Sequence, residues 1–371
     1  MKRRIIMLTM GSILIASCFL VKPEANFYEG KETTRKNTGT ENVFPTYYTD
    51  IIQNLEKNSF PESVYITDRV AAGNHYFIEN NILWGTGYNN YWQLGIEKEE
   101  DRNNLDSYYE TPVKIAENVI HIDASDNGYF TVYLTEDHKL YGLGANTEGV
   151  LLQPLQEFEE LNYHKNITGS PVLLMENVQF VSAGRKSLTV LTDDGNVFWW
   201  GKFQSTTASR DISCMSSTSP ELMVSQAIYT ACGPNFALAI DQDNNLWTWG
   251  NTVWGECGTD SDDDYLTQAV SVCSQVDMAW PESITFKQNT WTDPLSFDTN
   301  PYGEINYPYT LFVKRNDGDI YACGINLGNN KKTVRIHGDI NSEENEDGNY
   351  TFSYSSELVK IETIVAGSME P

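Results

Sequence analysis

The sequence predicts an all-β fold, a β-propeller, and two observations carry this prediction. One pattern occurs five times, an apolar strand, a polar turn, a strand with an aromatic residue and a closing glycine: FIENNILWGTG, LTEDHKLYGLG, LTDDGNVFWWG, IDQDNNLWTWG and VKRNDGDIYACG. The closing glycines then fall at positions 87, 144, 201, 250 and 324. Repeats of about 50 residues built from short strands are typical of propellers and solenoids.

A second half-pattern precedes each copy. Apolar and polar residues alternate through the segments 61–73, 111–125, 170–184, 219–233, 269–280 and 357–367. This alternation predicts half-buried strands, so each unit contains three or four short antiparallel strands. One such sheet cannot bury its own faces, whereas sheets stacked radially cover one another. A β-sandwich is the alternative, and five copies in one register disfavour it.

The turns between the paired strands support the hairpin prediction. Asp194-Gly195 and Asp317-Gly318 are strong tight-turn signals, because the favoured hairpin turns need positive φ. Asn244-Asn245 is a weaker signal of the same kind.

The tails that follow the closing glycines carry a family resemblance. The segments GYNNYWQLG, GANTEGVLL and GINLG, with Gly87, Asn89, Gln93, Leu94 and Gly95 in the first, match the tail G-x-N-x-x-G-Q-L-G. Over residues 61–371 the chain therefore resembles the regulator of chromosome condensation repeat family, whose fold is usually a seven-bladed β-propeller. This chain has five complete repeats and the front half of a sixth, which predicts about six blades. A closed six-bladed ring, an open ring and a truncated reading frame remain alternatives.

The N-terminus reads as an export signal. Lys2, Arg3 and Arg4 precede an apolar stretch of about 12 residues, too short to span a membrane, and IASC at 15–18 resembles a bacterial lipobox. The resemblance implies that Cys18 becomes the lipid-modified first residue of an outward-facing membrane lipoprotein. An ordinary secretory signal or an uncleaved anchor is the alternative. Residues 19–60 then form a polar tether with a short helix at 47–58.

The charge of the chain excludes one class of partner. The formal net charge is −26, and removing the basic residues of the leader makes it more negative. Nucleic-acid affinity depends on neutralising phosphates, so we expect no nucleic-acid binding. An exported protein also has no access to a nuclear GTPase, so the exchange activity known in the family is not carried over.

Neither a catalytic group nor a cofactor or metal site stands out. Five histidines lack metal-ligand spacing, and no catalytic motif is present. The acidic clusters at 260–264 and 341–349 are oxygen-rich, which suits calcium, but solvated surface loops are the favoured interpretation. Five cysteines follow Cys18, an odd number without CxxC, so buried thiols are favoured over disulfides.

The predicted binding residues are aromatic. Tyr91, Trp92 and Trp254 follow repeat glycines, and equivalent loops share one face of a propeller. The insertion 281–309, which adds Trp291, breaks the period, and long loops on rigid scaffolds often carry function. Packing between blades or on the rim is the alternative for each. We expect a binding module without enzyme activity for a cell-surface protein or glycan. An inhibitor of a secreted or cell-wall enzyme, or a carbohydrate-active enzyme, are the alternatives.

Overall fold

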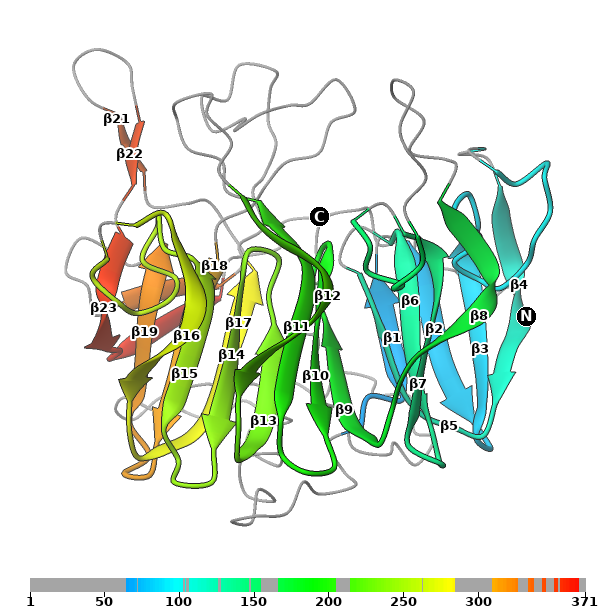
Figure 1. Cartoon of the computed structure of the whole chain (residues 1–371). Helices are drawn as coiled ribbons and strands as arrows, with labels where there is room; N and C mark the ends of the chain where they lie inside the picture. Colours follow the sequence, from blue (N-terminus) through cyan, green and yellow to red (C-terminus); the bar gives the residue numbers. More distant parts are fainter. Residues whose placement is uncertain are drawn as a thin grey trace, which may run out of the picture.

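The protein is a row of β-sheets that stand next to one another (Figure 1). The structure, a computed structural model, describes residues 65–366 except for 72, 103, 105–106, 126–127, 147, 155–165, 205–213, 262, 284–308, 326–332, 337–341, 345–349 and 353. Five four-stranded antiparallel sheets, called blades 1 to 5, follow one another along the chain. The all-β propeller prediction is confirmed.

Each blade runs from an inner strand to an outer strand, and the strands pair in chain order except in blade 5, whose fourth strand comes later. Blade 1 contains β1 (Asp68–Ala71), β2 (Asn74–Glu79), β3 (Ile82–Tyr88) and β4 (Tyr108–Glu117). Blade 2 contains β5 (Val119–Ala124), β6 (Phe130–Thr135), β7 (Lys139–Ala145) and β8 (Ile167–Glu176). Blade 3 contains β9 (Val178–Ala183), β10 (Ser187–Thr192), β11 (Val197–Gln204) and β12 (Cys214–Val224).

Blade 4 contains β13 (Ala227–Cys232), β14 (Phe236–Asp241), β15 (Leu246–Asn251) and β16 (Tyr265–Cys273). Blade 5 contains β17 (Val276–Ser283), β18 (Tyr309–Arg315), β19 (Ile320–Ile325) and β23 (Tyr354–Lys360). The two ends of the predicted insertion, 281–283 and 309, are therefore strand residues.

Beyond blade 5, the last predicted half-repeat forms a strand. β24 (Thr363–Ala366) pairs in parallel with β20 (Thr333–Ile336), and β21 (Ser342–Glu344) pairs with β22 (Tyr350–Phe352). The five complete repeats are thus five blades, and the sixth half-repeat contributes one strand outside them. The described residues contain no helix with the length and apolar character needed to cross a membrane.

The hydrophobic core lies between the blades. One cluster joins blades 1 and 2, a second joins blades 2 and 3, and a third extends through blades 3, 4 and 5. The largest buried side chains are the tryptophans Trp199, Trp200, Trp249 and Trp280. Both faces of the inner blades are covered by neighbours, so the second strands β6, β10 and β14 are buried at every position.

A left-handed residue joins each outer strand to the next inner strand. Asn118, Asn177, Gln226 and Gln275 have φ of 58°, 58°, 58° and 62°. The carbonyl of Asn118 accepts a hydrogen bond from Glu136 N at 2.8 Å, in the hairpin of the next blade. Val119 N donates to Asn81 O at 2.9 Å, in the hairpin of the preceding blade. The same pair of contacts recurs at the other three junctions, so these turns fasten each blade to its neighbour.

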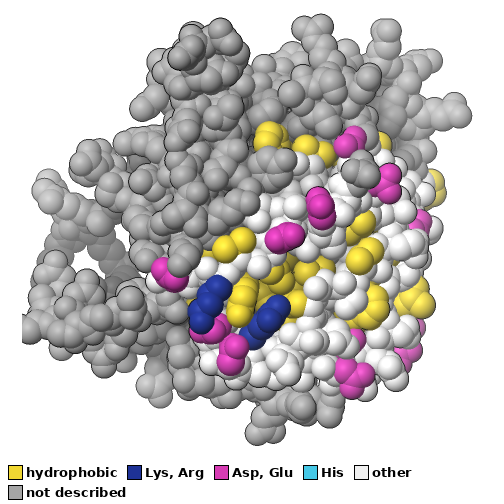
Figure 2. Space-filling model, turned by 90° about the vertical axis from the view of Figure 1, so that its left-hand side faces the viewer, with side chains coloured by type: hydrophobic (Ala, Val, Ile, Leu, Met, Phe, Trp, Pro, Cys, Tyr) yellow, Lys and Arg dark blue, Asp and Glu magenta, His cyan; other side chains and the backbone are white. Residues whose placement is uncertain are grey.

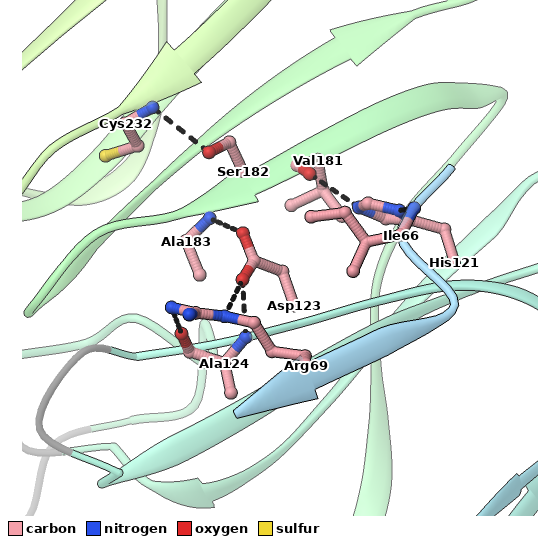
Figure 3. Close-up of polar contacts among 9 residues, drawn as sticks. All are labelled: Ile66, Arg69, His121, Asp123, Ala124, Val181, Ser182, Ala183 and Cys232. Carbon is pink, nitrogen blue, oxygen red and sulfur yellow. Dashed lines mark hydrogen bonds and ion pairs between the residues drawn. The ribbon is translucent and has the colours of Figure 1, made fainter. Parts of the chain in front are cut away.

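Polar side chains also connect the first strands of neighbouring blades (Figure 3). Asp123 on β5 accepts from Arg69 Nε at 2.9 Å and from Ala183 N at 2.8 Å, which links blades 1, 2 and 3. Both the Arg69 and Asp123 side chains are at most 5% exposed. Ser182 on β9 occupies the equivalent position and accepts from Cys232 N on β13 at 3.1 Å.

His121 on β5 makes a similar link. Its Nδ1 accepts from Ile66 N at 2.8 Å, so the proton is on Nε2, which donates to Val181 O at 2.8 Å. Burial lowers the pKa of His121 to about 4, with the Val181 carbonyl opposing the shift. The imidazole is therefore neutral and structural, as its lack of metal-ligand spacing predicts.

The closing glycines allow close packing of the backbone. Gly201 has φ of 103°, and a Cβ there would lie 2.3 Å from Lys186 O. Gly318 in the β18–β19 hairpin also has positive φ, 86°, but nothing lies within 4 Å of its Cβ position. Substitution of Gly318 therefore measures backbone strain alone, whereas substitution of Gly201 measures strain together with a steric clash.

We expect Gly201→Ala to destabilise the protein by about 2–3 kcal/mol, the sum of strain and clash. Gly318→Ala should cost only about 1 kcal/mol, the usual penalty for an L-residue with left-handed backbone. Thermal unfolding of both variants checks this. Equal losses of stability would show that Gly201 is not closely packed.

Candidate functional site

In blades 1, 2 and 4, the described parts of the loops that follow the closing glycines share one geometry and one face. These loops connect the third and fourth strands of their blades, at the upper end of the strands in Figure 1. In blades 1, 2 and 4, the fifth residue after the closing glycine has positive φ and starts a second tight turn. Gly149 and Gly255 occupy this position with φ of 75° and 73°, as the left-handed region favours.

In blade 1 this position is Trp92, with φ of 61°. A bulky L-residue in the left-handed region costs about 1–2 kcal/mol relative to glycine. Such strain persists where the surrounding structure imposes it, and it clusters at functional sites. Trp92 therefore differs from Gly149 and Gly255, the glycines at the same position in the loops of blades 2 and 4.

The segment 89–107, with Tyr88 and Tyr108 at its ends, is called here the aromatic loop. Asn89 fastens its first half: Oδ1 accepts from Leu94 N at 3.1 Å, and Nδ2 donates to Ile96 O at 2.8 Å. Asp101 fastens its second half, since Oδ2 accepts from Asn89 Nδ2 at 2.9 Å and from Tyr109 OH at 2.7 Å. Burial opposes ionisation of Asp101, but hydrogen bonds from Tyr109 and Asn89 outweigh it and lower its pKa.

The aromatic loop is also anchored on blade 2. The Tyr91 ring packs on Tyr129 with centroids 4.8 Å apart. The Glu97 carboxylate accepts from the backbone N–H groups of Gly169 and Ser170 on β8, at 3.0 and 2.7 Å. Thr131 donates to the Gln93 carbonyl at 3.0 Å. The loop is thus held on two blades, which limits the entropy cost of ordering it on binding.

Part of this aromatic surface faces solvent. Tyr108 is 51% exposed and meets Tyr88 edge-on, with centroids 5.1 Å apart. Trp92 is half-buried; its Nε1 donates to Lys98 O at 3.0 Å, and the Arg102 guanidinium lies 5.5 Å from its ring centroid. Tyrosine, tryptophan and arginine are the residue types most enriched among binding hot spots. The structure therefore brings Trp92, Arg102 and Tyr108 into one loop.

We expect Asp101→Ala to loosen the aromatic loop without unfolding the blades. Removing the carboxylate leaves Tyr109 OH and Asn89 without their acceptor, at a cost of about 1–3 kcal/mol. Hydrogen exchange should accelerate at the backbone amides of 89–107 and stay unchanged on β6. Unchanged protection of the loop would show that Asp101 does not hold it.

The sequence predicted four binding residues, and the structure places three of them. Tyr91 and Trp92 lie together in the aromatic loop. Trp254 is half-buried in the sister loop of blade 4, at the position equivalent to Tyr91, and blades 2 and 3 lie between the two in chain order. Trp291 lies outside the described residues. Sequence reasoning missed Tyr108 and Arg102, although the pair Tyr108-Tyr109 at the end of a polar run was a readable signal.

One position in the blade 4 loop differs in charge from its equivalent in blade 1. Gln93 accepts from Tyr91 N at 2.8 Å and donates to Asn90, whereas Glu256 accepts from Trp254 N at 2.8 Å and its other oxygen has no hydrogen-bond partner. Glu256 is completely buried, and burial raises its pKa to about 8, against the lowering effect of its backbone hydrogen bonds. The carboxyl is therefore mostly protonated at neutral pH.

The site offers no constellation for metal chemistry. Among the described residues, no group of three His, Cys, Asp or Glu side chains is placed to hold a metal ion. The five cysteines of the described chain are free thiols, of which Cys232, Cys257 and Cys323 are buried, as the sequence favoured.

The proteins that this chain resembles are of the kind that its sequence repeats indicate. No family model matches the chain. It is 22% identical over 244 residues to the guanine nucleotide exchange factor SRM1 of Saccharomyces cerevisiae, covering 62% of this chain and 45% of that protein. It is 26% identical over 191 residues to the regulator of chromosome condensation of Homo sapiens, covering 48% and 41%. The chain is similar to RCC1-type repeat proteins.

The solved structure of yeast RCC1 (Prp20) bound to Kap60 has a similar propeller fold. Its TM-score is 0.52 at 17% identity, over 82% of this chain and 67% of that one. The chain spans less than half of the length of the two curated relatives above. An RCC1-type β-propeller supports a protein-binding module, because loops on a rigid scaffold can be positioned precisely.

Proposed function

We propose that this RCC1-type propeller is a non-catalytic binding module that docks a protein partner on the aromatic loop of blade 1. The observation that supports this most is Trp92, a tryptophan with left-handed backbone where the sister loops have glycine. Exposed Tyr108 and the Arg102 guanidinium beside Trp92 extend the surface.

The test compares partner capture by the full-length protein and its variants. Trp92→Gly removes the indole and relieves backbone strain, so we expect a melting temperature close to wild type and at least about thirtyfold weaker capture, as for a hot spot of 2 kcal/mol. Tyr108→Ala should weaken capture similarly. Val270→Ala, which changes an exposed residue on the outer strand of blade 4, is the control and should capture normally.

The opposite result is equally informative. A core tryptophan truncated to a small residue costs about 3–5 kcal/mol. If Trp92→Gly lowers the melting temperature sharply, Trp92 is a packing residue. If both variants capture the partner as well as wild type does, the partner binds elsewhere.

We further propose that the partner is an extracellular protein of the cell surface, and that Cys18 anchors the propeller there through lipid. The support is the basic, apolar and IASC order of the leader. Labelled fatty acid should enter the wild-type protein and not Cys18→Ser. Absence of label from the wild type, or equal label in both, would remove the anchor from this proposal. The charge of −26 supports a protein partner over nucleic acid.

A further inference from the structure

An open depression of about 640 Å³ lies between blades 2 and 3, at the end of the strands opposite the aromatic loop. It is lined by residues from β8, the β10–β11 hairpin and β11: Met175, Glu176, Asn177, Thr192, Asp193, Asp194 and Phe198. Its floor thus combines a thioether and an aromatic ring, and its rim carries three carboxylates. Clefts of this volume are typical of ligand sites.

The junction between blades 4 and 5 shows which kind of side chain can occupy the position equivalent to this depression. Tyr321 there is equivalent to Phe198, since each lies three residues before a closing glycine, and Arg315 ends β18 as Thr192 ends β10. The Arg315 guanidinium lies over the Tyr321 ring, 4.4 Å from its centroid. A guanidinium of the chain itself therefore fills the equivalent position in blade 5.

At two other junctions between blades, other side chains contact the residue equivalent to Phe198. Between blades 1 and 2, Tyr133 stacks on Tyr141 with centroids 5.5 Å apart. Between blades 3 and 4, Asp241 accepts from Trp247 Nε1 at 2.8 Å. In blade 3 the residues equivalent to Tyr133 and Arg315 are the short Val190 and Thr192, so no long side chain of β10 reaches over Phe198.

The charge around the depression favours a cation. Glu176, Asp193 and Asp194 are exposed. Glu176 pairs across the strands with Lys139, which interacts with it electrostatically, but the hydrogen bond of the Lys139 ammonium goes to Asp137. The nearest basic groups are occupied, since Lys139 bonds Asp137 at 2.7 Å and His138 bonds Asp193 at 2.7 Å.

An apolar surface continues outward from Phe198. Leu222 pairs directly with Phe198 across β11 and β12, so both side chains lie on the same face of the sheet. Leu222 is 52% exposed. A comparable mixture of apolar and charged side chains covers the flank of the described fourth and fifth blades (Figure 2).

We propose that this depression binds an arginine side chain of a protein partner. The guanidinium lies over Phe198, as that of Arg315 lies over Tyr321, and pairs with the carboxylate of Glu176. An apolar residue next to the arginine packs on Leu222. This site goes beyond the proposed function, because it lies on the opposite face from the aromatic loop and recognises a different chemistry.

The test titrates the full-length protein with the peptide acetyl-Gly-Leu-Arg-Leu-Gly-amide, measured by calorimetry. A peptide with citrulline in place of arginine keeps the shape without the charge, and should bind about tenfold more weakly. Glu176→Gln should weaken arginine-peptide binding about threefold. Thr192→Arg should abolish it, because the new side chain can occupy the depression as Arg315 occupies its own.

Melting temperatures verify that the variants are folded, and Val270→Ala, on another blade, should bind the peptide like wild type. The proposal is overturned if wild type fails to bind the arginine peptide or binds both peptides equally. It is also overturned if folded Thr192→Arg binds as well as wild type. Trp92→Gly should leave peptide binding unchanged, which separates this site from the aromatic loop.

Discussion

Asp123→Ala is expected to destabilise the protein by about 3–5 kcal/mol, because it removes the carboxylate that neutralises the buried Arg69. The same change removes the acceptor of Ala183 N, so it weakens the link from blade 2 to both neighbours. The thermal midpoint should fall by roughly 10 °C.

Two further variants identify the cause. Asp123→Asn keeps an acceptor for Ala183 N but loses the charge, so it should lie between wild type and Asp123→Ala. The double change Arg69→Met with Asp123→Leu removes both charges and should recover much of the loss, as apolar replacements of buried ion pairs often do. If Asp123→Ala unfolds at the wild-type temperature, the inner-strand network contributes little.

Glu256→Gln is expected to stabilise the protein above pH 4.5, and the gain should grow with pH. In the folded protein the pKa of Glu256 is about 8, whereas in the unfolded chain the carboxyl loses its proton near its ordinary pKa of 4.5. The contribution of this group to stability is therefore complete below pH 4.5 and is lost as pH rises to about 8. At 1.36 kcal/mol per pKa unit, the gain from Gln is roughly 3 kcal/mol at pH 7.

His121 makes the stability of the protein change with pH in the opposite direction, and the Glu256→Gln variant should reveal this dependence. Its pKa falls from 6.5 to about 4 on folding, so its contribution is complete above pH 6.5 and is lost as pH falls toward 4. Between pH 4.5 and 6.5 the two slopes oppose one another in the wild type. Denaturant unfolding at a series of pH values should therefore show stability of Glu256→Gln rising through that range. A difference between the two proteins that does not change with pH would contradict a raised pKa for Glu256.

The repeats made the blades predictable from sequence, because each strand pair carries its own hairpin signal. Asp194-Gly195, Asp317-Gly318 and Asn244 do lie in tight turns with positive φ at Gly195, Gly318 and Asn244. The links between blades were harder to predict, because they join residues far apart in sequence. Arg69 and Asp123 are 54 residues apart. Both lie in repeated half-patterns, 61–73 and 111–125, but the pattern does not specify which polar residues pair.

The candidate site was predictable only in part. Trp92 is predicted from sequence as a binding residue because it follows a repeat glycine, but its left-handed backbone, at a position where the sister loops have glycine, is visible only in the structure. The depression between blades 2 and 3 was not predicted, because it depends on which residue covers Phe198. That comparison requires the strand register, which aligns Thr192 with Arg315.

The most direct test of the binding surface is site-specific photocrosslinking of the full-length protein in its own cells. A photoreactive amino acid is placed at Tyr108 in the aromatic loop and, as the control, at Val270 on the outer strand of blade 4. Both positions are exposed, at 51% and 38%, so both can react in random collisions with other proteins. We predict a discrete protein adduct from position 108 that Trp92→Gly abolishes, and none from position 270. Adducts of equal yield from both positions, or from position 270 alone, would contradict the aromatic loop as the binding surface.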